Sequence, residues 1–124
     1  MNTPNQPHQA SSAALMSESD FNDRVDAFLI HVEAALDAAD TDIDSELNGG
    51  ILTLTFANDS KVIVNRQAPL REIWLAAKSG GYHFRFDGAT WKDTRSSENL
   101  NLALARVLRE QAGVDHANVT SITF

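Results

Sequence analysis

Residues 42–92 consist of short segments in which apolar and polar side chains alternate, with turn residues between the segments. The pattern is clearest in residues 51–56 (ILTLTF), and the Asn-Gly-Gly sequence at 48–50 before them is typical of hairpin turns. Successive side chains of a strand point to opposite faces, so each segment predicts a strand with one apolar face. The predicted inward positions are Leu52, Leu54, Phe56, Val62, Val64, Ile73 and Leu75.

Two amphipathic helices are predicted, one on each side of the strand-rich region. Residues 18–39 and residues 97–112 both repeat apolar side chains at helical spacing. Serine side chains before each segment can accept the first free N–H groups, and a glycine after the second can end it. The predicted caps are Ser17 or Ser19 for the first helix, and Ser96 or Ser97 with the stop at Gly113 for the second.

These elements together predict an α+β fold. The simplest arrangement is a two-layer sandwich, with both helices packed on one face of a five- to six-stranded antiparallel sheet. We expect the domain to span residues 17–113, after a disordered N-terminal tail at residues 1–16. Residues 114–124 are assigned to a C-terminal tail, with two alternatives left open: its apolar side chains pack along the helices, or it frays.

Charge is distributed unevenly along the 124 residues, whose formal net charge is −7. Residues 1–46 contain ten acidic side chains and one arginine, a net charge of −9, whereas residues 47–124 contain seven acids and nine bases, a net charge of +2. The acidic balance argues against nucleic acid and anionic membranes as partners. The absence of cysteine excludes disulfides, thiolate metal sites and a cysteine nucleophile.

The densest chemical feature is a run of carboxylates from the first helix into the first strand, which we call the acidic ridge. Oxygen-only ligands suit hard cations, and an exposed ridge is expected to bind them weakly, with water completing the coordination. A solvated acidic face without a ligand is the alternative. An EF-hand is rejected, because Ser45 and Ile51 stand where that loop needs glycine and glutamate. The ridge consists of Glu33, Asp37, Asp40, Asp42, Asp44 and Glu46.

The second candidate surface is the sheet face turned away from the helices. Strand alternation places Trp74 there together with Asn65 and Gln67, and no third element remains to cover them. An uncovered tryptophan among polar side chains is typical of a partner-binding anchor. The alternative is that Trp74 only packs on its cross-strand neighbours. The histidines come from different elements and indicate no paired nucleophile.

The stretch from Asn65 to Phe84, NRQAPLREIWLAAKSGGYHF, closely resembles the signature of the frataxin family, in particular its bacterial CyaY-type branch. The acidic first helix, the DIDSELNGGILTLTF segment, and later Trp91, Arg95, Ser96 and Glu98 match as well. The resemblance covers residues 17–112. Two departures reduce the number of acids: Ala34 and Ala38 stand where bacterial relatives often carry further acids, and the loop between the helix and the first strand is short.

The resemblance implies an iron-binding adaptor or regulator of iron–sulfur cluster assembly rather than an enzyme. It implies weak binding of Fe²⁺ or Fe³⁺ on the acidic ridge, and contacts with the cysteine desulfurase and the scaffold protein. It further implies a cytoplasmic bacterial protein, monomeric with iron-driven oligomers. The partner-binding residues that we expect are Asn65, Arg66, Gln67 and Trp74. Alternative hypotheses are a ferroxidase or iron-storage-like activity, and a metal-independent acidic protein-binding module.

Overall fold

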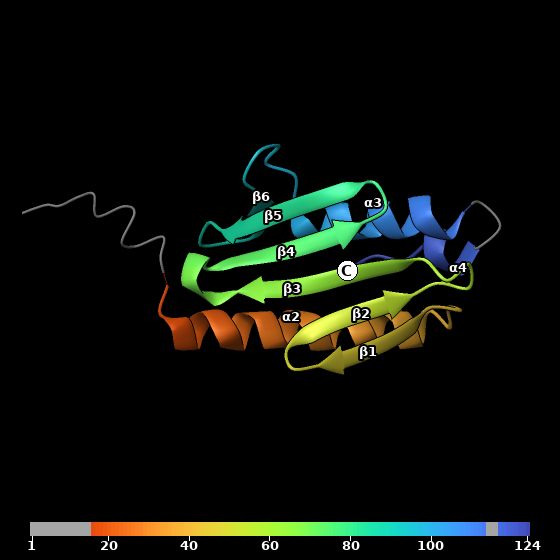
Figure 1. Ribbon diagram of the computed structural model, residues 1–124, viewed down its shortest axis with the longest axis horizontal. Coiled ribbons are helices and arrows are strands. Elements are labelled where there is room, and N and C mark those ends of the chain that lie inside the picture. The colour runs from red at the N-terminus through yellow and green to blue at the C-terminus, as the bar shows by residue number, and fades with distance from the viewer. Residues whose placement is uncertain (1–15, 114–116) are drawn as a thin grey trace, which may run out of the picture.

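The structure, a computed structural model, describes residues 16–113 and 117–124 (Figure 1). Six antiparallel strands form one sheet in the order β1-β2-β3-β4-β5-β6, so every strand pairs with its neighbours in the chain. The strands are β1 (Asp44–Asn48), β2 (Ile51–Thr55), β3 (Lys61–Gln67), β4 (Glu72–Ala77), β5 (Gly80–Phe86) and β6 (Trp91–Asp93). The helices are α2 (Glu18–Ala38), α3 (Leu100–Ala112), the short α4 (Ala117–Thr120) and the 3₁₀ turn η2 (Ala68–Leu70).

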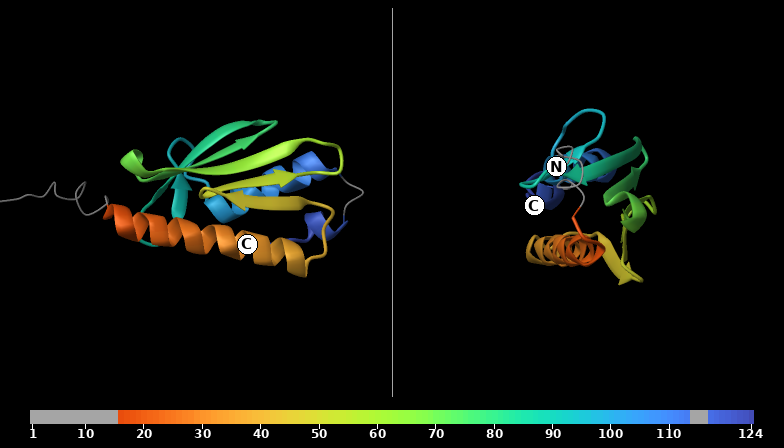
Figure 2. Two further views of the ribbon diagram at one scale, coloured as in Figure 1. Left: turned by 60° about the horizontal axis from the view of Figure 1, so that its bottom comes forward. Right: turned by 90° about the vertical axis from the view of Figure 1, so that its left-hand side faces the viewer.

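The helices lie on one face of the sheet and leave the other face open (Figure 2). This is the predicted α+β two-layer sandwich. Its sheet has six strands, the larger of the two predicted numbers. Apolar burial drives the layers together, because each strand and each helix has an apolar side that only the opposite layer can cover. The predicted inward positions of β2, β3 and β4 are all buried in the core, as are Phe56 and, from β5, Phe84.

The first helix follows the prediction closely. Ser17 is its N-cap, and the Ser17 hydroxyl accepts a hydrogen bond from the Asp20 N–H at 3.0 Å. The helix ends at Ala38, one residue earlier than predicted, because Asp40 adopts a left-handed conformation with φ 51°. Its buried side chains are Phe21, Val25, Leu29, Val32 and Leu36.

The second helix begins later than predicted, so the expected serine caps are wrong. Its N-cap is Asn99, whose side chain accepts a hydrogen bond from the Asn101 N–H at 2.9 Å. Ser97 has φ 64° and belongs to a turn that is held by Asp93, so this segment cannot yet be helical. The helix ends at Ala112, and the predicted stop, Gly113, is its C-cap with φ 91°.

The C-terminal residues that the structure describes pack into the core, which favours the first of the two alternatives for this segment. Val119 and Ile122 are buried, and the Phe124 carbonyl accepts a hydrogen bond from the Asn101 side chain at 3.1 Å. At the other end, residues 1–15 of the tail predicted at 1–16 lie outside the described residues, as do residues 114–116. The last residue of that predicted tail, Met16, packs against the core, and its carbonyl accepts a hydrogen bond from Arg71 Nε at 2.9 Å. Within the described part of the chain, no helix is both long and apolar enough to cross a membrane.

Candidate functional site

The carboxylates of the acidic ridge are mostly exposed. Asp37, Asp40 and Asp42 follow one another from the last turn of α2 into the loop before β1, and all three are exposed. Glu33, one turn earlier, is half-buried and accepts a hydrogen bond from the Ser45 hydroxyl at 3.2 Å. This contact ties α2 to β1, so that the helix and the first strand form one edge of the molecule (Figure 1).

The two strand carboxylates of the acidic ridge turn away from α2. Asp44 lies opposite Thr55 in the sheet, and Glu46 lies opposite Thr53. These positions belong to the open sheet face, whereas Ser45 between them faces the helix. The two strand carboxylates share one face, as predicted, but they do not continue the helix carboxylates directly. The acidic ridge therefore runs around the β1 edge and does not form a single flat surface.

The acidic ridge is not neutralised by the basic side chains of the described residues. Among residues 16–113 and 117–124, five of its six side chains have neither an ion pair nor a side-chain hydrogen bond, and Glu33 has only the Ser45 hydroxyl. The described part of the chain also contains no group of three or more His, Cys, Asp or Glu side chains placed to hold a metal ion together. A cation on this edge would thus be bound by one or two carboxylates and by water, an arrangement that gives weak affinity.

Arg66 does not belong to the surface to which we assigned it. Its guanidinium donates a hydrogen bond to Asn22 Oδ1 at 3.0 Å and forms an ion pair with Asp26, both on α2. Its side chain is only 18% exposed. Strand alternation turns Arg66 toward the helices, while its neighbours Asn65 and Gln67 face the open side of the sheet. The prediction that Arg66 joins the partner-contact surface is corrected accordingly.

Trp74 lies on the open sheet face, as predicted, and stacks on His83 of the adjacent strand. The two ring centroids are 4.1 Å apart and the ring planes differ by 6°. Asn65 lies opposite Trp74 on β3, and Gln67 lies two positions further along the same face. The structure therefore brings together three of the four predicted partner-contact residues.

Glu72 is the residue of this face that sequence reasoning missed. It lies two positions before Trp74, on the same side of β4, and it is only 5% exposed. Its carboxylate accepts hydrogen bonds from Trp74 Nε1 at 2.8 Å and from Arg85 Nη2 at 2.5 Å. The sequence could have placed Glu72 on the Trp74 face, because the two residues are two positions apart in one strand. Spacing within the strand does not reveal that Arg85 of the next strand lies opposite Glu72.

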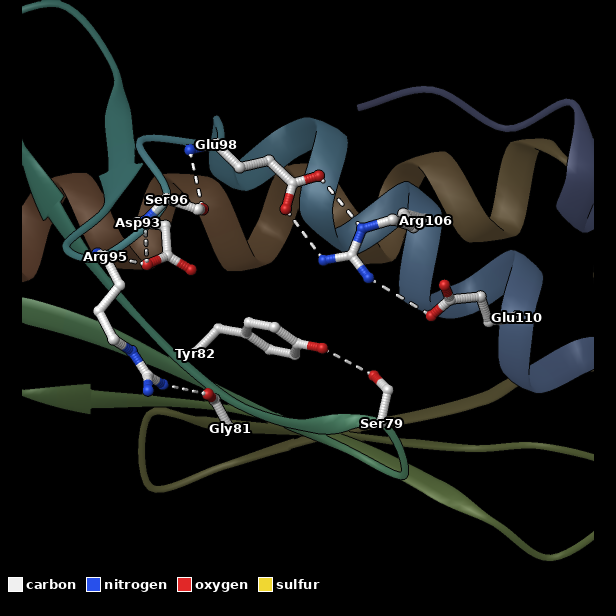
Figure 3. A network of polar contacts seen from close by, with 9 residues as sticks. All are labelled: Ser79, Gly81, Tyr82, Asp93, Arg95, Ser96, Glu98, Arg106 and Glu110. Atoms are coloured by element: carbon white, nitrogen blue, oxygen red, sulfur yellow. Dashed lines mark hydrogen bonds and ion pairs between the residues drawn. The ribbon is translucent and has the colours of Figure 1, made fainter.

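The residues around the β6–α3 turn form a polar network (Figure 3). The Asp93 carboxylate accepts the N–H groups of Arg95 at 2.7 Å and Ser96 at 3.2 Å, which holds the turn closed. Arg106 of α3 pairs with Glu98 at 2.9 Å, and this pairing raises the pKa of Arg106. Arg95, Ser96 and Glu98, which carry part of the family resemblance, thus have a structural role here.

A family model described as a frataxin-like domain matches residues 14–114. This chain belongs to the frataxin family. Among curated bacterial frataxins, the iron-sulfur cluster assembly protein CyaY of Burkholderia mallei (strain SAVP1) is 50% identical over 102 residues, which are 80% of this chain and 94% of that protein. CyaY of Paraburkholderia phymatum is 50% identical over 98 residues, which are 79% of this chain and 93% of that protein.

Solved frataxin structures agree with the fold. The frataxin of Psychromonas ingrahamii superposes with a TM-score of 0.75 at 33% identity, over 78% of this chain and 92% of that one. The trimeric frataxin of the yeast Saccharomyces cerevisiae superposes with a TM-score of 0.59 at 29% identity, over 89% of this chain and 94% of that one. The resemblance drawn from the signature at residues 65–84 is thereby confirmed.

Proposed function

We propose that this frataxin is an iron-binding adaptor that regulates iron–sulfur cluster assembly in the bacterial cytoplasm. Its curated relatives at 50% identity are named iron-sulfur cluster assembly proteins, which supports a role in that process. The single observation that carries the finer proposal is the acidic ridge, whose exposed carboxylates have no basic partner among the described residues.

Iron is the cation that this edge is proposed to carry as cargo. Carboxylate oxygens are hard ligands that suit Fe²⁺ and Fe³⁺. Like charges repel one another at the end of α2, since Glu33 and Asp37 lie one turn apart and Asp40 follows directly after the helix. A bound cation or a basic protein surface relieves that repulsion. The open, water-accessible arrangement suits a carrier that releases its ion readily.

Two different faces are proposed for two partners. The acidic ridge docks on a basic surface of the cysteine desulfurase, an attraction that salt weakens through screening. The Trp74 face, with Asn65 and Gln67 beside it, contacts the scaffold protein. The strand carboxylates Asp44 and Glu46 lie on the same open sheet face as Trp74, and β2 and β3 lie between β1 and β4. One frataxin molecule can therefore contact both partners of an assembled complex.

Charge reversal on α2 tests the desulfurase contact. Replacing Glu33, Asp37 and Asp40 together by lysine is expected to abolish binding to the desulfurase in a calorimetric titration, with the fold intact by circular dichroism. The matched control reverses three exposed acids at the other end of α2, Glu18, Asp20 and Asp23, for the same change in net charge. Unchanged affinity in the first variant, or equal losses in both, contradicts the proposed docking surface.

An anaerobic Fe²⁺ titration followed by ¹H–¹⁵N NMR tests the metal role. We expect shifts and line broadening confined to residues 33–46, with gradual saturation because affinity is weak. If the NMR signals of residues 33–46 do not change, the metal role is wrong and the alternative of a metal-independent acidic protein-binding module remains. Multiple turnovers of oxygen consumption on addition of Fe²⁺ in air instead indicate a ferroxidase.

A further inference from the structure

The open sheet face contains a buried carboxylate directly beside its half-buried aromatic pair, Trp74 and His83. Glu72 is 5% exposed, although none of the helices in the described part of the chain covers this face. A buried carboxylate is costly unless it is hydrogen-bonded and paired with a cation. Glu72 has a hydrogen-bond donor in Trp74 and a cationic partner in Arg85, and both are side chains of the same sheet face. The three side chains therefore form a hydrogen-bonded network.

Each contact of Glu72 restricts one neighbour. Its Oε1 accepts the indole N–H of Trp74 at 2.8 Å, and its Oε2 accepts Arg85 Nη2 at 2.5 Å. His83 Nδ1 lies 3.9 Å from Oε1, and the imidazole stacks on the indole with ring planes 6° apart. The carboxylate therefore fixes the rotation of the indole and the position of the ring that lies against it.

The hydrogen bond to Glu72 also decides what Trp74 can offer to a partner. The indole has one polar donor, and that donor is already used within the protein. A partner on this face meets the apolar surface of a ring that is already held in place. A side chain that is ordered before binding loses less conformational entropy when the complex forms.

We propose that Glu72 is a positioning residue: it holds the Trp74 indole and the His83 ring together as a preordered aromatic platform for the scaffold protein. This inference rests on the proposed function, since it assumes that the Trp74 face is used. Glu72 itself is buried and acts through Trp74, whereas the platform provides the direct contact. Arg85 completes the network, because its guanidinium neutralises the buried charge of Glu72.

The first test needs no partner. In ¹H–¹⁵N spectra the Trp74 indole N–H of the unmodified protein exchanges slowly with solvent, and Glu72→Leu accelerates that exchange at least tenfold. Glu72→Gln keeps the shape and one acceptor oxygen, so its exchange rate lies between the two. The indole of Trp91, which is in the core, serves as the internal control and stays unchanged. Equal exchange rates of the Trp74 indole in all three proteins overturn the proposal.

The second test is a thermodynamic cycle with the purified desulfurase–scaffold complex as the probe. Glu72→Leu is expected to weaken binding about three- to tenfold, the loss expected when a fixed aromatic side chain becomes free to rotate. Glu72→Gln is expected to keep most of the affinity of the unmodified protein. In a Trp74→Ala background the same Glu72→Leu change has no further effect, because the group that it positions is gone. Additive losses overturn the positioning role and indicate a direct contact of Glu72.

The cycle separates failure of the inference from failure of the proposed function. If Trp74→Ala weakens binding but Glu72→Leu does not, only the positioning role is wrong. If neither variant changes the affinity, the Trp74 face is not used and both proposals fail. If Glu72→Leu lowers the melting temperature strongly, a loss of affinity could come from unfolding. The affinity of Glu72→Gln then decides between these outcomes.

Discussion

Some acidic side chains of the described residues accept hydrogen bonds from backbone N–H groups of their own turn, whereas others accept no hydrogen bond. Asp87 and Asp93 belong to the first kind, since each accepts two backbone N–H groups in a turn. Asp37 and Asp44 belong to the second kind within the described residues. The first kind stabilises the fold, whereas the second leaves charge available to a ligand, at a cost of a few tenths of a kcal/mol for each close like-charged pair.

Asp87 is expected to titrate at unusually low pH. The N–H groups of Thr90 and Ala89, and Lys92 at 3.1 Å, lower the pKa of Asp87 from 3.8 to about 2. Since the folded-state pKa lies below the unfolded one, the stabilisation is complete above pH ~4 and is lost as pH falls toward 2. NMR titration should give a midpoint near 2, and Lys92→Ala should raise it only partly because the backbone bonds dominate. A midpoint near 3.8 contradicts this prediction.

In the β1–β2 hairpin, the position of strand β1 depends on the conformation of the turn. Gly49 and Gly50 have φ values of 61° and 78°, a left-handed pair that matches the twist of the flanking strands. Gly50 also lies against Arg66, whose Nε donates a hydrogen bond to the Gly50 carbonyl at 3.4 Å. The turn therefore fixes the position of β1, and with it the strand carboxylates of the acidic ridge.

Alanine at the two glycines should have unequal effects. A Cβ at Gly50 would lie 2.9 Å from Arg66 Nε, whereas a Cβ at Gly49 would meet nothing within 4 Å. Gly49→Ala is thus expected to cost about 1 kcal/mol for its backbone conformation. Gly50→Ala is expected to cost about 2 kcal/mol, because the Arg66 guanidinium that would have to move is held by Asn22 and Asp26. Urea unfolding of the two variants measures the difference. Equal losses would show that the Arg66 contact is unimportant.

Across the whole molecule, the C-terminal segment completes the helical layer. Ile122 is 6% exposed and joins the same core as Val119 and the buried side chains of α2 and α3. Figure 2 shows the chain end returning to the helix side of the sheet. Among residues 16–113 and 117–124 no segment covers the open face, so the core lies on one side of the sheet and the proposed partner surface on the other.

Ile122→Ala is expected to destabilise the domain by about 2 kcal/mol, through lost apolar contact and a cavity that the chain end only partly refills. Thr123→Ala, at the exposed neighbouring position, serves as the control and should change stability by less than ~0.5 kcal/mol. Thermal unfolding by circular dichroism measures both variants. A negligible effect of Ile122→Ala would mean that the segment contributes little to the stability of the domain.

Much of the fold could be predicted because alternation and helical spacing are local properties. The apolar faces of β2, β3 and β4 follow from period-two patterns that any extended backbone imposes. The start of α3 was mispredicted because Asp93, six residues before its cap, holds the intervening turn. The acidic ridge could be found as a sequence run, but not its bend around the β1 edge.

By itself the sequence determined which side chains alternate, which dipeptides turn, where charge accumulates and to which family the chain belongs. Only the tertiary structure decided that Arg66 pairs with Asp26, and that the Glu72 carboxylate accepts both the indole N–H of Trp74 and the guanidinium of Arg85 from the next strand. The physical reason is that periodicity fixes the face of a residue within its own element. Partners across elements depend on register and packing, which bring together residues that are far apart in the chain.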